Sequence, residues 1–412
     1  MNLLRFTTAG SVDDGKSTLI GRLLYDSKSV YIDQMESVER TSRRKGLDKI
    51  DFSLLSDGLK DEREQGITID VAYRYFSTPA RKFIIADTPG HIQYTRNMVT
   101  GASSADAGLI LIDARQGVVE QTRRHSFISG LLGIPSVMVC INKMDLVDFD
   151  QKHYDQIVSD FEAVKISCNL KSVEFIPISA LLGDNIVDTS KNMPWYNGPT
   201  LLNHLETVKI DNPALTNSFR MPIQNIIRPH SNEYHDYRGY SGRIASGQIS
   251  LGDLITIYPS KKSSIVKGIL RGDLSIEKAI TGDSVSISLK DDIDISRGDV
   301  LCTGDDPSIE KKLDATICWL DNEPQRLGSK YILRQGTNES NSMITEIKGV
   351  LNVHTLDFKA SKGPLTSNEI AQISLKSTKV IVYDSYSRNR ITGSFILIDN
   401  VTGSTVAAGM IS

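Results

Sequence analysis

The sequence lacks any long hydrophobic run. Its longest apolar stretches, such as residues 107–112 and 135–141, fall far short of the roughly 20 residues of a membrane-spanning helix. A basic leader is also missing at the N-terminus, so we expect residues 1–9 to begin a strand rather than a signal peptide. Only four cysteines are present, and no two of them stand at a short paired spacing. This distribution argues against a zinc site or a disulfide framework and favours the reducing cytoplasm.

A strong basic excess is missing as well. The formal net charge is -3, and residues 213–412 hold 23 Lys and Arg against 22 Asp and Glu, while residues 1–212 hold 24 against 28. Proteins that bind the phosphate backbone of nucleic acids usually carry a clear basic patch or excess. We therefore expect neither nucleic acid nor a membrane as a partner.

Hydrophobic patterning divides the chain near residue 211. The first part alternates strand-like and helix-like segments, which favours a mostly parallel sheet, and the second part is rich in short β segments separated by Gly, Asp, Ser and Asn. We predict an α/β P-loop domain over residues 1–211 and two β-barrel domains over 212–307 and 308–412. The predicted strands of the first domain are 3–9, 71–76, 82–86, 108–112, 136–141 and 172–178, and its predicted helices are 16–24, 93–101, 120–132 and 152–166. The charged segment 36–45 is predicted to be a solvated helix face.

Residues 10–17 read Gly-Ser-Val-Asp-Asp-Gly-Lys-Ser, the complete pattern of a phosphate-binding loop between a predicted strand and a predicted helix. Its glycines allow backbone N–H groups to close around a phosphate at the helix N-terminus. Lys16 would reach the β- and γ-phosphates, and the Ser17 hydroxyl would bind Mg²⁺. The residues assigned to this part of the nucleotide site are Gly10, Ser11, Val12, Asp13, Asp14, Gly15, Lys16, Ser17 and Thr18.

Two further segments have the spacing of a nucleotide-binding domain. Asp87 and Gly90 close the third predicted strand, where the carboxylate can hold the metal through water and the glycine N–H can meet the γ-phosphate. Thr68, just before the second strand, has the hydroxyl that completes the Mg²⁺ coordination in an ordered switch loop. We therefore expect Ser17, Thr68 and Asp87 at the metal, and Lys16, Thr68 and His91 as the catalytic residues.

The Asn142-Lys143-Met-Asp145 segment at the end of the fifth predicted strand indicates guanine as the base. A carboxylate at Asp145 can accept two parallel hydrogen bonds from the guanine ring N–H and its exocyclic amine, a pair that adenine does not offer. Asn142 can brace the loop, and the aliphatic part of Lys143 can cover the ring. The last assigned nucleotide-binding residues are Ser179, Ala180 and Leu181, of which the backbone is expected to read the guanine O6.

His91 directly follows Gly90, and two interpretations stay open. It is either a polar residue at a helix start or the residue that orients the attacking water, and we favour the second because phosphoryl transfer depends mainly on positioning. Other histidines carry less information. We expect His230 and His235 to be exposed polar residues rather than a metal site, and we expect His125 on a helix surface.

The chain resembles the elongation factor Tu family in Asp87-Thr-Pro-Gly-His91, in Asn142-Lys-Met-Asp145 and in its predicted domain order. Within that superfamily it is most similar to the GTP-binding large subunit, CysN type, of bacterial ATP sulfurylase. That closer resemblance rests on residues 10–27, 61–76, 93–102, 121–127 and 237–242. Elongation factors usually carry histidine where Ser11 stands, and the family usually has glutamate where this chain has Ile92.

The resemblance implies a three-domain, elongation factor Tu-like fold, with GTP and Mg²⁺ as cofactors. It also implies a CysD-type small subunit as partner, which forms adenosine 5′-phosphosulfate from ATP and sulfate while this subunit couples GTP hydrolysis to that reaction. Two alternatives stay open: a translation elongation-type GTPase that binds aminoacyl-tRNA, and a stand-alone regulatory GTPase. The lack of net basicity beyond Pro213 counts against the first.

Overall fold

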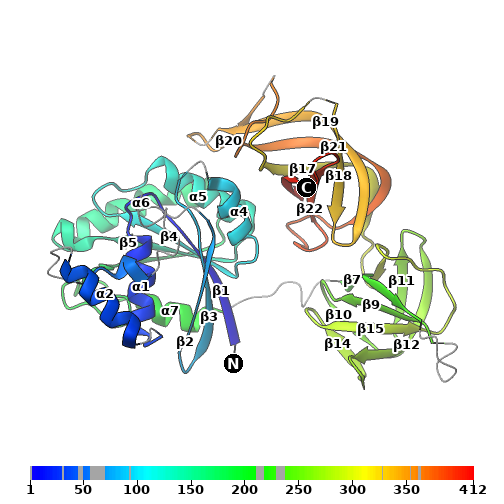
Figure 1. Cartoon of the computed structure of the whole chain (residues 1–412), viewed down its shortest axis with the longest axis horizontal. Coiled ribbons are helices and arrows are strands. Elements are labelled where there is room, and N and C mark those ends of the chain that lie inside the picture. The colour runs from blue at the N-terminus through cyan, green and yellow to red at the C-terminus, as the bar shows by residue number, and fades with distance from the viewer. Residues whose placement is uncertain are drawn as a thin grey trace. The chain divides into compact units, whose positions relative to one another are not determined.

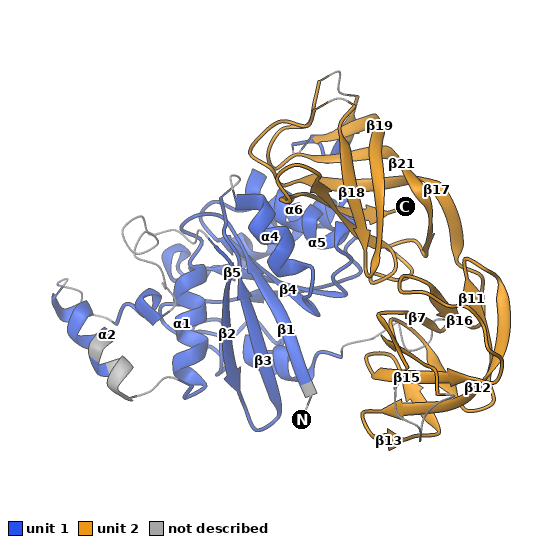
Figure 2. Cartoon of the chain, turned by 45° about the vertical axis from the view of Figure 1, so that its right-hand side comes forward, with its two compact units in different colours: residues 1–211, 352–357 blue, residues 212–351, 358–412 orange. Residues whose placement is uncertain are grey.

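The computed structural model describes residues 2–29, 32–44, 50–55, 70–91, 94–209, 218–228, 237–326, 328–352, 354–360 and 363–412. These residues form two compact units, one made of residues 1–211 and 352–357 and the other of residues 212–351 and 358–412 (Figure 2). All four cysteines lie within the described residues and are buried, and none of them forms a disulfide bond. Within the described ranges, no helix is long and apolar enough to cross a membrane.

The first unit is built on a six-stranded sheet in the order β2-β3-β1-β4-β5-β6 (Figure 1). Only β2 runs antiparallel to its neighbour, and the other strands are parallel. The strands are β1 (Asn2–Ala9), β2 (Ala72–Ser77), β3 (Arg81–Asp87), β4 (Ala107–Asp113), β5 (Ser136–Asn142) and β6 (Ser172–Pro177). Each lies within one or two residues of its predicted position, because short apolar runs bounded by turn residues are strong strand signals.

Helices connect these strands. They are α1 (Lys16–Asp26), α2 (Ile32–Arg44), α4 (Thr95–Ala102), α5 (Glu120–Leu131), α6 (Gln151–Ser167) and α7 (Leu201–Thr207), with 3₁₀ turns at Phe52–Leu55 (η1) and Met144–Val147 (η3). β4 and β5 are buried along their whole length, as expected for central parallel strands covered on both faces. In α2 the charged residues Glu36, Arg40, Arg43 and Arg44 are exposed, which confirms the predicted solvated face.

Parallel pairing brings the carboxyl ends of four strands to one edge of the sheet. Thr8 of β1 pairs with Asp87 of β3, and Asp113 of β4 pairs with Asn142 of β5. In open α/β sheets, ligands bind at this edge, beyond the carboxyl ends of the strands. The topology therefore gathers the loops that follow β1, β3, β4 and β5 at one place.

The described residues of the second unit form two large antiparallel sheets and one two-stranded sheet. The first has the strand order β7-β16-β11-β12-β15-β9-β8, with β13 paired to β12, and a separate two-stranded sheet joins β10 and β14. Its strands are β7 (Arg220–Pro222), β8 (Asn225–Ile227), β9 (Gly239–Arg243), β10 (Gln248–Ser250), β11 (Leu254–Tyr258), β12 (Lys262–Arg271), β13 (Leu274–Ser275), β14 (Lys278–Ile280), β15 (Ser284–Leu289) and β16 (Val300–Cys302). These strands enclose one buried apolar core.

The second sheet closes into a barrel, because β18 pairs with both β22 and β19 in the order β18-β22-β23-β17-β21-β19-β20. Its strands are β17 (Ser308–Trp319), β18 (Lys330–Gln335), β19 (Asn338–Asn352), β20 (Asp357–Lys359), β21 (Ile370–Tyr383), β22 (Ser394–Asp399) and β23 (Thr405–Ile411). A second apolar core fills this barrel. Closure leaves few unpaired strand edges, which is how antiparallel proteins limit unwanted strand pairing.

A buried ion pair joins the two sheets of this unit. The Arg220 guanidinium donates to both carboxylate oxygens of Asp384, at 3.0 and 3.1 Å, and also to the backbone carbonyls of Phe219, Thr303 and Asp305. The side chains of Arg220 and Asp384 are only 2% and 5% exposed. Because every hydrogen bond needed by the charged groups is made within the protein, this pair is a closed structural contact.

Candidate nucleotide site

The loop between β1 and α1 has the geometry of an anion-binding turn. Gly15 is the N-cap of α1 with φ 94°, a conformation that strongly favours glycine, and a Cβ there would lie 2.5 Å from the Asn142 side-chain nitrogen. Asp14 is 2% exposed, and its Oδ2 accepts a 2.5 Å hydrogen bond from the Ser11 N–H. Burial raises the pKa of Asp14 to about 6. The first N–H groups of an α-helix have no acceptor within the helix itself, which makes this end of α1 suited to an anion.

Lys16 stands at the centre of this loop. Its side chain is buried, and Nζ donates to the backbone carbonyls of Gly10 at 2.9 Å and Ser11 at 3.1 Å. Burial lowers the pKa of Lys16, opposed by the nearby charge of Asp87. Gly90 reaches the same point from β3, since a Cβ on it would lie 2.3 Å from the Gly10 carbonyl oxygen and 2.7 Å from Lys16 Nζ. Only a glycine fits between these groups without displacing them.

The structure describes two of the three residues predicted to hold the metal, Ser17 and Asp87. Asp87 is 3% exposed and accepts a hydrogen bond from the Thr8 hydroxyl at 3.1 Å, while Ser17 is half-buried in the first turn of α1. His91 is half-buried, with its ring centroid 6.1 Å from that of Tyr94. Thr68 and Ile92 lie outside the described residues, as do His230 and His235.

Asn142 ties three loops together. Its Nδ2 donates to the Asp14 carbonyl at 2.7 Å, and its Oδ1 accepts from the Ala180 N–H at 2.9 Å. Its own carbonyl accepts from the Ala114 N–H at 2.9 Å. This residue therefore braces the segment of residues 142–145, the predicted base loop, against both the phosphate loop and the 179–181 segment.

The remaining predicted residues lie around the same site. Asp145 is half-buried in η3, Ser179 and Ala180 are buried, and Leu181 is 42% exposed. Lys143 extends its ammonium back to the phosphate loop, where it donates to the Asp13 carbonyl at 2.5 Å. Val12 and Thr18 are half-buried in the loop and in the first turn of α1.

Sequence reasoning missed two residues at this site and misplaced a third. Asp113 is the last residue of β4, and Arg115 follows that strand. The end of β4 carried no recognised motif, although Asp113 contacts Lys143 at 3.0 Å. The sequence could have indicated them. A charged residue at the end of a parallel strand lies at the same edge of the sheet as the motifs that end the neighbouring strands. The prediction for His125 was wrong, since its side chain is 3% exposed and interacts with the Gly90 backbone. Its helix α5 has almost no apolar face, so helical periodicity gave no sign of which side is buried.

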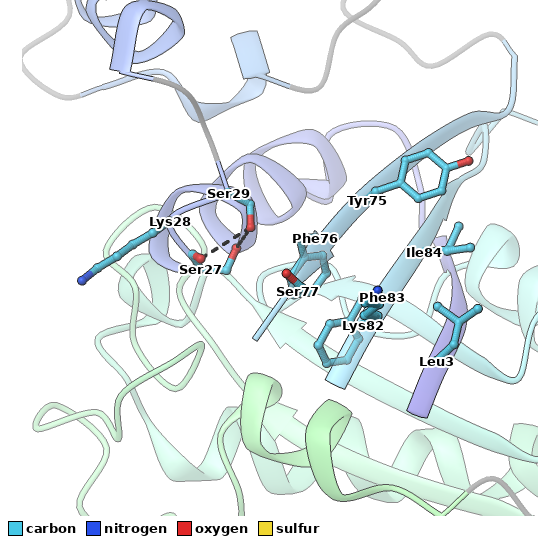
Figure 3. A pocket seen from close by; sticks show the side chains of 10 residues that line it. All are labelled: Leu3, Ser27, Lys28, Ser29, Tyr75, Phe76, Ser77, Lys82, Phe83 and Ile84. Atoms are coloured by element: carbon cyan, nitrogen blue, oxygen red, sulfur yellow. Dashed lines mark hydrogen bonds between the residues drawn. The ribbon is translucent and has the colours of Figure 1, made fainter. Parts of the chain in front are cut away.

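A separate cavity of about 570 Å³ lies away from this edge (Figure 3). It is lined by residues at the amino end of β1, at the end of α1 and on the β2–β3 hairpin, namely Leu3, Ser27, Lys28, Ser29, Tyr75, Phe76, Ser77, Lys82, Phe83 and Ile84. Phe76 and Phe83 stack here with ring centroids 4.4 Å apart. None of the predicted nucleotide-binding residues lines it.

Comparisons with known proteins agree with this geometry. Residues 1–216 match the elongation factor Tu GTP binding domain, and residues 312–412 match the GTP-eEF1A C-terminal domain-like family. Sulfate adenylyltransferase subunit 1 of Bacteroides thetaiotaomicron is 49% identical over all of this chain and 86% of its own length. The subunit 1 of Aliarcobacter butzleri is 51% identical over 99% of this chain and 87% of its own.

A longer relative is also similar to this chain. The bifunctional enzyme CysN/CysC of Mycobacterium tuberculosis is 50% identical over 99% of this chain but only 67% of its own length. Both the phosphate loop and the guanine motif fall inside the matched GTP-binding domain, and two β domains follow it. The chain is thus a GTP-binding protein with the three-domain architecture of elongation factor Tu, and it belongs to the sulfate adenylyltransferase subunit 1 family.

Proposed function

We propose that this chain is the GTP-hydrolysing subunit of a sulfate adenylyltransferase. In this role it couples GTP hydrolysis to the formation of adenosine 5′-phosphosulfate from ATP and sulfate on a CysD-type small subunit. The observation that carries the proposal is identity of about half of all positions, over essentially the whole chain, to proteins named as subunit 1 of this enzyme. A cytoplasmic location is part of the proposal, as are domain boundaries at 211/212 and 307/308.

The phosphate-site roles rest on the contacts around Lys16. We assign Lys16 to the β- and γ-phosphates, because its ammonium lies between the phosphate loop and Gly90 and donates to carbonyl oxygens of that loop. Ser17 and Asp87 supply the hard oxygen donors that Mg²⁺ prefers, and Thr68 is proposed to join them from the switch loop. Bound there, the cation would neutralise phosphate charge. The protein itself would hold the triphosphate chain in line for attack by one water molecule and exclude other water molecules from the site.

His91 is proposed to orient the attacking water. Positioning of this kind matters in the transition state and hardly in the ground state. His91→Ala should therefore leave GTP affinity near that of the unchanged protein and slow single-turnover hydrolysis by about a hundredfold. A variant that lost affinity and rate together would assign the histidine a structural role instead.

The base-site roles concern Asp145, Asn142 and Lys143. We assign the Asp145 carboxylate to the paired guanine N–H groups, so Asp145→Asn should lower GTP affinity by orders of magnitude. Xanthosine triphosphate, which presents a carbonyl in place of the guanine amine, should bind the variant better than GTP does. Unchanged GTP binding by Asp145→Asn in a fluorescent-nucleotide titration would refute the assignment.

Coupling requires a partner that senses the nucleotide state. A partner with equal affinity for the GTP and GDP forms would transmit nothing, so the small subunit must contact segments that respond to the γ-phosphate. The candidates are the segment at residues 66–70 and the one ending at Gly90-His91. The described nucleotide site is specific for guanine in this proposal, which leaves ATP and sulfate to the partner.

Reconstitution of both subunits tests the coupling. The chain alone should form no adenosine 5′-phosphosulfate and should hydrolyse GTP slowly. With the small subunit added, product yield should be higher with GTP than with GDP or a non-hydrolysable analogue. Equal yields under all three conditions would overturn coupling and favour a stand-alone regulatory GTPase. Retention of aminoacyl-tRNA by the GTP-bound chain would favour the elongation-factor alternative.

A further inference from the structure

A buried carboxylate at the end of β4 contacts the base loop. Asp113 is 1% exposed, and its two oxygens accept hydrogen bonds from the Arg115 backbone N–H at 3.0 Å, from Arg115 Nε at 3.0 Å and from Arg115 Nη2 at 2.6 Å. Lys143 Nζ completes the set at 3.0 Å from Oδ2. Asp113 reaches Lys143 because β4 pairs with β5 in a register that places Asp113 beside Asn142.

Lys143 is held in a costly conformation. Its backbone is left-handed, with φ 62°, and the Asp13 backbone that its ammonium binds is left-handed too, with φ 68°. Each such residue other than glycine costs roughly 1–2 kcal/mol and persists only where its surroundings impose it. The ammonium joins these two residues and is itself anchored on Asp113.

The charge on Asp113 is secure. Burial alone would raise its pKa, but hydrogen bonds from Arg115 and Lys143 outweigh burial and lower the pKa to about 2. Arg115 is half-exposed and also lies in the field of Asp145. Two negative side chains, Asp113 and Asp145, and two positive ones, Lys143 and Arg115, therefore interact with one another beside Asn142.

We propose that Asp113, oriented by Arg115, is a positioning residue of the guanine site. It holds the Lys143 ammonium in place before any nucleotide binds. The aliphatic part of Lys143 is then positioned to cover one face of a guanine ring. The inference rests on the proposed base site. It adds two residues from outside the recognised motifs on which guanine-nucleotide affinity depends.

The test is Asp113→Asn, which keeps the shape of the side chain and removes its charge. Kd for GDP and for GTP should rise by about tenfold, equivalent to about 1.4 kcal/mol. The two nucleotides should lose affinity equally, because Lys143 faces the base and not the γ-phosphate. KM for GTP should rise while the rate at saturating GTP stays unchanged. Arg115→Gln, which keeps the Asp113–Lys143 pair, should raise Kd by about threefold.

Asp106→Asn is the matched control. Asp106 precedes the other end of β4, accepts from the Arg5 N–H at 2.9 Å, and should leave both Kd values unchanged. A double-mutant cycle with Lys143→Met should show that Asp113→Asn costs almost nothing once the ammonium is gone.

Two results would overturn the inference. One is a lowered melting temperature with unchanged Kd in both Asp113→Asn and Arg115→Gln. That result would show that Asp113 and Arg115 only stabilise the turn after β4. The other is a double-mutant cycle in which the losses of nucleotide affinity from Asp113→Asn and Lys143→Met simply add. Failure of the base site itself would look different, because Asp145→Asn would then leave base selectivity unchanged.

Discussion

Two buried cations in this chain have opposite surroundings. Arg220, between the two sheets of the second unit, is neutralised by Asp384 and makes further hydrogen bonds to three backbone carbonyls. Lys16, in the first unit, is also buried. Among the described residues its ammonium donates to the carbonyls of Gly10 and Ser11, while Asp87 acts on it through its nearby charge. A buried charge without a hydrogen-bonded counter-charge is costly, and a ligand with negative charge would offset that cost at Lys16. The contrast separates a structural cation from a binding cation.

Removing the counter-charge of Arg220 should have the largest effect. Asp384→Ala leaves a guanidinium buried and unpaired, so the free energy of unfolding of the second unit should fall by about 3–5 kcal/mol. The chain has two tryptophans, Trp195 in the first unit and Trp319 in the second. In a Trp195→Phe background, the fluorescence of Trp319 during urea unfolding therefore reports the second unit alone.

The matched control for that measurement is Asp305→Ala. The Asp305 carboxylate pairs with Arg388 at the surface, where its side chain is 70% exposed. An exposed pair of this kind contributes less than about 1 kcal/mol. Similar losses in Asp384→Ala and Asp305→Ala would erase the distinction between the buried pair and a surface pair. GTP affinity should be unchanged in both variants.

Removing the Lys16 ammonium tests the contrast at the nucleotide site. Lys16→Ala should weaken GTP and GDP binding by about a hundredfold or more, because charge-assisted hydrogen bonds to phosphate are lost. The nucleotide-free first unit should be no less stable than before, since the cost of burying the ammonium is gone. Nucleotide titration and urea unfolding followed by Trp195 emission measure the two effects. A large loss of stability without loss of affinity would show that Lys16 is structural, as Arg220 is.

Some features of the fold and of the nucleotide site were predictable from the sequence, and others, such as the Arg220–Asp384 pair, were not. Strand positions in the first unit were predictable because the strands are short apolar runs, several of which end in a polar residue, such as Asp87 or Asn142. The residues of the phosphate and guanine motifs converge because parallel strands bring their carboxyl ends to one edge. The Arg220–Asp384 pair was not predictable, since 164 positions separate its members and neither stands in a motif. His125 was assigned to the surface because its neighbours Arg123 and Arg124 are charged, whereas its burial depends on tertiary packing.

Two titratable groups beside Lys16 respond to pH in opposite directions. Burial raises the pKa of Asp14 from 3.8 to about 6, so the folded state holds this proton more tightly than the unfolded state does. Stability from Asp14 is therefore lost as pH rises from about 4 to 6. Burial, with Lys16 and Arg124, lowers the pKa of His125 from 6.5 to about 3, so stability from His125 is lost as pH falls from 6.5. The two slopes oppose each other between about pH 4 and 6.

Single substitutions should separate these slopes. Relative to the unchanged protein, nucleotide-free Asp14→Asn should gain stability as pH rises from 4.5 to 6, by up to about 1.4 kcal/mol per pH unit. His125→Gln should instead gain stability as pH falls over the same range. Both substitutions keep a polar group of similar size, so the Ser11 N–H and the Gly90 backbone retain a possible partner. Urea unfolding at four pH values measures the slopes, and slopes of the same sign in Asp14→Asn and His125→Gln would contradict the opposed titration of these two groups.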